Sequence, residues 1–159
     1  MNRTTARLFW ALAALLVAGA ASADTIDDIR ERGTLRIGVA EFAPWTLKNR
    51  DGKLEGFEID VGRRVAYDMR VQPDFRLYAW DEIIDGLERG EIDIIAAGMA
   101  ISPERALRVE FSNPYTWSGT TLVTNTEVAP DAESIDDLNQ EGKVVVTVAQ
   151  TMSGIAAPA

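Results

Sequence analysis

The stretch GFEIDVGRRVAYDM, residues 56–69, decides the fold of this chain. Its apolar residues Phe57, Val61, Val65 and Met69 recur every four positions, which predicts an amphipathic helix from about residue 57 to residue 69. Strand patterns flank it, since LRIGV at 35–39 alternates in polarity and 71–78 is also strand-like. A strand, a helix and a second strand in this order indicate a right-handed crossover between parallel strands.

The same alternation continues on both sides of this unit. Residues 25–32 predict a short helix that Gly33 stops, and Ile83, Ile84 and Leu87 form one face of another helix that ends at Gly90. A buried strand is expected at 92–97, followed by a helix with Ser102 as N-cap and Pro103 in its first turn. The fold class is therefore α/β, a parallel sheet flanked by helices on both faces.

A second unit begins further along the chain. We expect a strand at 120–124, a linker at 127–133, a short helix at 135–138, a strand at 144–148 and a polar turn at 150–153. One strand and a turn cannot complete a sheet, so we expect this unit to be only begun within the chain.

The first 23 residues have the layout of a secretory signal peptide. A basic start at 2–7 precedes an apolar run at 8–20 and the small residues ASA at 21–23. The apolar run is shorter than the ~20 residues of a spanning helix. We expect the mature chain to start near Asp24, outside the cytoplasm.

Composition excludes several classes of function. The 159 residues include no histidine and no cysteine, which rules out Ser-His-Asp and Cys-His triads, the usual zinc sites and disulfides. A net charge of −9 argues against a nucleic-acid partner. Asn49, Asp51, Gly52 and Glu58 match positions 3, 5, 6 and 12 of an EF-hand calcium loop, but Leu47 occupies position 1 and no flanking helix pair is evident. The Gly-x-Gly-x-x-Gly fingerprint of dinucleotide-binding proteins is absent. We expect no metal and no cofactor.

Four ordered motifs resemble one known family. They are GFEIDV at 56–61, followed by Val65, Ala66 and Met69, then GTLRIG at 33–38, the segment from Ile92-Asp93 to ISPER at 101–105, and FSNPY at 111–115. In these the chain is similar to the family 3 extracellular solute-binding proteins, the periplasmic receptors of polar amino-acid ABC importers. The resemblance covers nearly all of residues 25–125 and continues more weakly to about 153.

The resemblance implies a type II periplasmic binding protein fold, in which two α/β lobes close around one ligand. Lobe one would span 24–119, a crossing (hinge) strand 120–126, and an incomplete start of lobe two 127–159. It further implies a monomer in the periplasm that captures an L-amino acid and delivers it to the membrane permease of an ABC importer. On this reading the chain is the N-terminal part of a longer receptor.

Arg105 is the main candidate for ligand binding. It lies in the first turn of a helix at the carboxyl edge of the sheet, where ligands of such sheets bind. In the resembled family the arginine at this place clamps the α-carboxylate of the ligand. The alternative is a surface arginine paired with Glu104 or Glu110.

The resemblance assigns further contacts to two loops and to lobe two. Gly98 would offer its carbonyl to the ligand ammonium and Ala100 its N–H to the carboxylate, with Met99 between them. Thr151 would close on the carboxylate from a helix start, although Gln150-Thr151-Met152 departs from the family pattern Gly-Thr-Thr.

Three aromatic residues, Phe42, Trp45 and Trp80, would form apolar walls of the site by the same resemblance. An aromatic face stacks on an aliphatic stem or holds a cation. Core packing is the alternative, above all for Trp45.

Two other functions stay open on this fold. One is a periplasmic cyclohexadienyl dehydratase-like enzyme, which requires an acid–base group over its substrate. Lobe one offers only Glu41 for that role. The other is the sensing domain of a receptor, which would need a membrane span. We expect a binding protein and not an enzyme.

Overall fold

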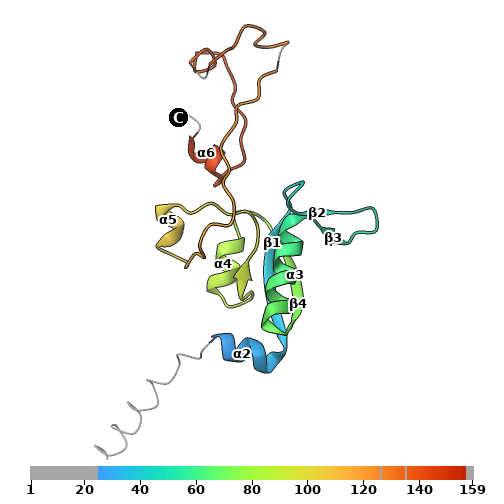
Figure 1. Ribbon diagram of the computed structural model, residues 1–159. Helices are drawn as coiled ribbons and strands as arrows, with labels where there is room; N and C mark the ends of the chain where they lie inside the picture. Colours follow the sequence, from blue (N-terminus) through green and yellow to red (C-terminus); the bar gives the residue numbers. More distant parts are fainter. Residues whose placement is uncertain (1–24, 126, 135, 157–159) are drawn as a thin grey trace, which may run out of the picture.

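The computed structural model describes residues 25–125, 127–134 and 136–156 (Figure 1). The signal peptide predicted at 1–23 lies outside these residues. The elements, in chain order, are α2 Thr25–Arg32, β1 Thr34–Ala40, β2 Leu47–Lys48, β3 Leu54–Glu55, α3 Phe57–Met69, β4 Gln72–Tyr78, α4 Ile83–Glu88, β5 Ile94–Ile95, α5 Pro103–Ala106 and α6 Met152–Ala156. None of the described helices is long and apolar enough to cross a membrane.

The main sheet is parallel, as predicted, with the strand order β4-β1-β5. Strand β1 pairs with β4 along its whole length, from Thr34 opposite Gln72 to Ala40 opposite Tyr78. It pairs with β5 only at Ile37 and Gly38. Helices α3 and α4 make the two crossovers, and β2 and β3 form a small antiparallel hairpin between β1 and α3.

The core lies on both faces of β1, because successive side chains of a strand point to opposite faces. Leu35, Ile37 and Val39 are fully buried in a cluster with residues of α3, including Ile59. On the other face, Gly38 lets Ile83 of α4 and Ile92 approach the strand. Helices α3 and α4 therefore cover opposite faces, and β1 is the centre of the domain.

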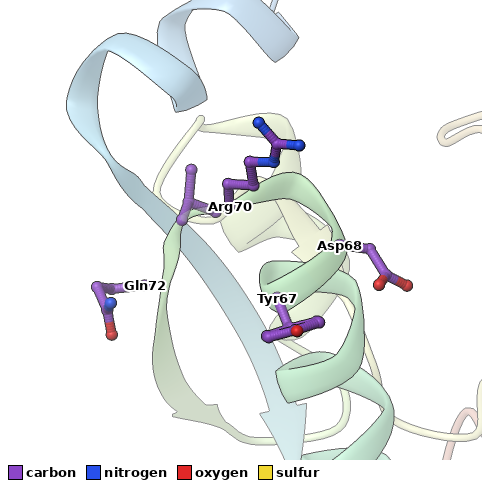
Figure 2. A pocket seen from close by; sticks show the side chains of 5 residues that line it. Tyr67, Asp68, Arg70 and Gln72 are labelled. Carbon is purple, nitrogen blue, oxygen red and sulfur yellow. The ribbon is translucent and has the colours of Figure 1, made fainter.

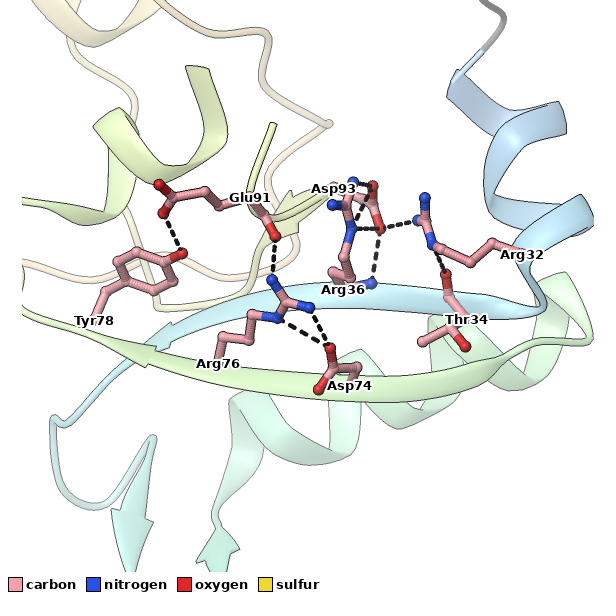
Figure 3. Close-up of polar contacts among 8 residues, drawn as sticks. All are labelled: Arg32, Thr34, Arg36, Asp74, Arg76, Tyr78, Glu91 and Asp93. Atoms are coloured by element: carbon pink, nitrogen blue, oxygen red, sulfur yellow. Dashed lines mark hydrogen bonds and ion pairs between the residues drawn. The ribbon is translucent and has the colours of Figure 1, made fainter. Parts of the chain in front are cut away.

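A buried carboxylate ties β1 to the segment before β5 (Figure 3). The Asp93 side chain is only 2% exposed and accepts 2.6 Å hydrogen bonds from the guanidinium groups of both Arg32 and Arg36. It also accepts the peptide N–H of Arg36 at 2.8 Å. Burial raises the pKa of Asp93, but the hydrogen bonds and charges of the arginines outweigh it, so this pKa lies below its ordinary value.

We expect Asp93→Asn to lower the free energy of unfolding by about 2 to 4 kcal/mol, because it removes the buried anion with which two partly exposed arginines pair. The depressed pKa means that this contribution is present above the ordinary carboxyl pKa and is lost as the pH falls through the lowered value. Urea denaturation at neutral and acid pH should show that acidification lowers the free energy of unfolding less in the variant than in the wild type.

Asp74→Asn is the matched control for this experiment. Asp74 also pairs with an arginine, Arg76 at 2.9 Å, but its side chain is 40% exposed. Exposed pairs contribute little, about 1 kcal/mol or less. Equal losses in the two variants would show that burial of Asp93 does not set its contribution.

The structure corrects several predicted elements. The strand expected at 92–97 forms only at Ile94–Ile95, and no strand forms at 120–124 or 144–148. Residues 136–138 of the helix expected at 135–138 are in turns, and residue 135 is outside the described part. The turn expected at 150–153 instead leads into α6 at Met152. A strand needs a paired neighbour, and Val123 and Val146 are 87% and 89% exposed.

Candidate functional site

Arg105 is held in place by the start of α5. The Ser102 hydroxyl accepts the peptide N–H of Arg105 at 3.4 Å, which makes Ser102 the N-cap, as predicted. Only 8% of Arg105 is exposed. Its Nη1 donates to the Ala100 carbonyl at 2.8 Å, and the guanidinium carbon lies 5.5 Å from the centroid of the Trp80 ring.

The guanidinium of Arg105 has no carboxylate partner among the described residues. The alternative of a surface ion pair with Glu104 or Glu110 is therefore not formed. Burial lowers the pKa of Arg105, and the charge of Glu104 partly opposes this. A buried cation whose partners among the described residues are all neutral is suited to bind an anion.

The Gln150 carbonyl oxygen marks the point where donors converge. Arg105 Nη2 donates to it at 2.6 Å and Trp80 Nε1 at 3.1 Å. Gln150 has a φ of 60°, uncommon for a residue other than glycine. A carboxylate oxygen at the position of this carbonyl would meet the same donors.

The loop at 98–100 lies beside this point. Gly98 has a φ of 59° and is exposed, while Met99 and Trp80 pack on one core cluster with Ile83. Ala100 contributes its carbonyl, which Arg105 binds. The structure thus brings together Arg105, Trp80 and the loop, which are three elements of the predicted site.

Phe42 and Trp45 belong to a separate loop after β1. Phe42 is 59% exposed, and Trp45 packs edge-on against Phe57 with ring centroids 5.5 Å apart. Among the described residues, no hydrogen bond or ring contact joins either of them to Arg105. The contact of Trp45 with Phe57 corresponds to the packing alternative.

Thr151 lies at a helix start, as expected. Its Oγ1 accepts the Gly154 N–H at 3.1 Å and donates to the Val148 carbonyl at 2.6 Å. Thr151 directly follows Gln150, whose carbonyl accepts from Arg105.

Glu58 is a further functional candidate, which was not among the residues predicted from the sequence. This residue is fully buried in the first turn of α3. A signal was present, because residues 58, 62 and 66 are spaced by four and share one helix face, and Gly62 and Ala66 are also buried.

A surface hollow lies away from these residues, where α3 ends and β4 begins (Figure 2). It is lined by Tyr67, Asp68, Arg70, Val71 and Gln72. The labelled side chains point apart and do not converge on a common point. We therefore place no ligand site there, in contrast to the converging donors around Arg105.

Comparisons with known proteins support one family. The sequence profile of the bacterial extracellular solute-binding proteins, family 3, matches residues 35–146. A probable amino-acid ABC transporter periplasmic-binding protein of Sinorhizobium fredii is 31% identical over 139 residues, which cover 86% of this chain and 46% of that protein. The chain spans about half the length of the curated relatives it matches first.

Solved structures give the same result. The ancestral amino acid-binding protein AncCDT-1, described as a precursor of cyclohexadienyl dehydratase, matches with a TM-score of 0.70 and 38% identity over 74% of this chain and 52% of its own. The arginine-bound form of domain 1 from TmArgBP matches with a TM-score of 0.55 and 34% identity, over 56% of this chain and 71% of its own. The chain has a type II periplasmic-binding fold and belongs to the bacterial extracellular solute-binding proteins, family 3.

Proposed function

We propose that this protein is the periplasmic substrate-binding component of an ABC importer, which captures an L-amino acid and delivers it to a membrane permease. The observation that carries the proposal is the buried guanidinium of Arg105, which has no carboxylate partner among the described residues and shares its acceptor with Trp80. The α-carboxylate of an amino acid supplies the missing anion. Membership of the family supports the same role.

In this proposal each candidate residue has one task. Arg105 binds the carboxylate together with the Ala100 N–H, and the Gly98 carbonyl accepts from the ammonium. Trp80, Met99, Phe42 and Trp45 line the ligand stem, and Thr151 approaches from the second unit. When the ligand binds, a carboxylate oxygen replaces the Gln150 carbonyl as the acceptor of Arg105 and Trp80.

The proposed organisation of the chain follows the sequence analysis. Residues 1–23 export the protein, 24–119 form lobe one, 120–126 cross between lobes and 127–159 begin lobe two. The protein works as a monomer in the periplasm.

Binding is a better proposal than catalysis for this site. A dehydratase needs an acid–base group over its substrate, and Glu41, the candidate for that role, is exposed in the loop after β1. AncCDT-1, although described as a precursor of an enzyme, is itself described as an amino acid-binding protein.

Calorimetry against the standard L-amino acids tests the proposal. From the sequence, a chain with only one complete lobe is expected to bind amino acids weakly or not at all. A single domain of a relative is nevertheless described as arginine-bound, which supports the use of this chain in the titration. We expect saturable binding of at least one amino acid, and no binding of the matching amine that lacks the carboxylate. Equal affinity for the two compounds would contradict the proposal.

We further expect Trp80→Leu to remove most of the ligand-induced change in tryptophan fluorescence and to weaken binding. Its indole contacts both Arg105 and the Gln150 carbonyl, so a ligand that replaces this carbonyl changes the surroundings of the ring. Trp117→Leu is the control, because Trp117 is 91% exposed. If Trp80→Leu leaves signal and affinity intact, Trp80 serves only the core.

A further inference from the structure

The carboxylate of Glu58 is buried without the partners that such a group requires. The residue is 0% exposed, and its Oε2 accepts one hydrogen bond, from the Tyr115 hydroxyl at 2.8 Å. Its Oε1 is buried and makes no hydrogen bond of ordinary geometry within the described residues. Burial of a carboxylate without a partner costs free energy. We therefore expect Glu58 to have a functional role that accounts for its presence in the core.

Oε1 faces the loop at 98–100. A Cβ atom built on Gly98 would lie 3.4 Å from Oε1, so the backbone of this loop rests against the carboxylate. The Gly98 amide is close enough to lower the pKa of Glu58. A small shift of the loop would bring this N–H into hydrogen-bond geometry with Oε1.

Glu58 also touches the loop after β1 through its backbone. Its peptide N–H donates to the Trp45 carbonyl at 3.0 Å. The Phe57 ring, one residue earlier, lies between Trp45 and Tyr115, at 5.5 Å and 6.0 Å between centroids. The first turn of α3 therefore connects the loop at 42–46, the loop at 98–100 and Tyr115.

We propose that Glu58 is a positioning residue for ligand binding, whose carboxylate fixes the loop at 98–100 and Tyr115 relative to α3. This inference rests on the proposed function, in which Gly98 and Ala100 contact the amino acid. Glu58 does not touch the ligand. It acts through the backbone that does.

The charge state of Glu58 follows from its surroundings. Burial raises its pKa, while the Tyr115 hydroxyl and the Gly98 amide lower it, and the net pKa is raised. No charged side chain of the described residues is among the groups that shift it. Burial and the contact with Glu58 in turn raise the pKa of Tyr115, so the phenol keeps its proton and remains the donor. The ionised carboxylate has acceptor oxygens for both neighbours, whereas the protonated acid offers one acceptor fewer.

A spectroscopic titration tests the contact without any ligand. We expect the Gly98 amide proton in ¹H–¹⁵N spectra to shift with one carboxyl titration whose pKa lies above that of an ordinary glutamate. Glu58→Gln should abolish this shift and Tyr115→Phe should move its pKa upward, because the hydroxyl no longer stabilises the anion. The exposed Glu55, mutated to Gln, is the control and should change neither. A Gly98 shift that persists in Glu58→Gln would overturn the proposal.

The effect of Glu58 on ligand binding is tested by the affinity for L-arginine, the amino acid bound by domain 1 from TmArgBP. We expect Glu58→Ala to raise Kd about tenfold, as for the loss of one charge-assisted hydrogen bond, and Glu58→Gln to recover part of it. Where Glu58→Ala fails to fold, Glu58→Gln and Tyr115→Phe carry the test. Thermal stability is measured in parallel, because a merely structural role lowers Tm and leaves Kd unchanged below it.

The outcomes separate this inference from the proposed function. If Arg105→Ala abolishes binding while folded Glu58 variants bind as the wild type does, Glu58 is not a positioning residue and the proposed function stands. If the wild type binds no amino acid, the proposed function fails, and the Gly98 titration still decides whether Glu58 holds the loop.

Discussion

Gly56→Ala is expected to lower the free energy of unfolding by about 3 kcal/mol or more, from backbone strain and steric overlap together. Gly56 has φ 124° and ψ 176°, a region that residues with a Cβ essentially do not adopt. A Cβ at this position would also collide with the carbonyl oxygen of Trp45, and a backbone atom cannot move away as a flexible side chain would. The loop at 42–46 and the start of α3 would both have to shift.

Gly90→Ala is the matched control in urea denaturation. Gly90 also has a positive φ, 68°, but nothing lies within 4 Å of its missing Cβ. The left-handed conformation alone costs about 1 to 2 kcal/mol. Equal losses in the two variants would mean that the close approach to Trp45 is not what Gly56 provides.

Arg105→Ala is expected to raise the Kd for the bound amino acid about tenfold or more, since a charge-assisted hydrogen bond contributes roughly 1.5–3 kcal/mol and 1.4 kcal/mol is a factor of ten. The removed guanidinium is the buried cation at the centre of the proposed site, and its loss leaves only neutral donors, the Trp80 indole and the Ala100 N–H, for the ligand carboxylate. Calorimetry with the amino acid that binds the wild type measures the change.

Arg64→Ala controls for the loss of one positive charge. Arg64 lies on α3 in an exposed pair with Asp68 at 2.9 Å, away from the residues proposed to bind. We expect the Kd of the Arg64→Ala variant to equal that of the wild type. An unchanged Kd in Arg105→Ala would place the carboxylate elsewhere, and a loss in both variants would indicate a long-range charge effect.

The elements predicted correctly are those that local rules specify. Helix α3 begins and ends as its four-residue repeat indicates, and α5 begins at the Ser102 cap. The alternation of strands and helices predicted β1, β4 and their parallel pairing, because a helix between two strands serves as the crossover between parallel neighbours. The motifs at 33–38, 56–61 and 101–105 also led to the family and to Arg105.

The elements predicted wrongly are strands at 120–124 and 144–148. Both have suitable apolar residues, and Val144 and Val146 remain 88% and 89% exposed. A sequence pattern describes only one strand of a pair. The strand forms only when a second segment of the chain supplies its hydrogen-bond partners.

Within the candidate site, the sequence by itself determined which side chain carries the charge, and only the tertiary structure decided its partners. Arg105 meets the Gln150 carbonyl across 45 positions, and Tyr115 meets Glu58 across 57. No helical or strand periodicity relates residues so far apart. The tertiary fold brings these residues together, and burial then decides which donors and acceptors satisfy one another.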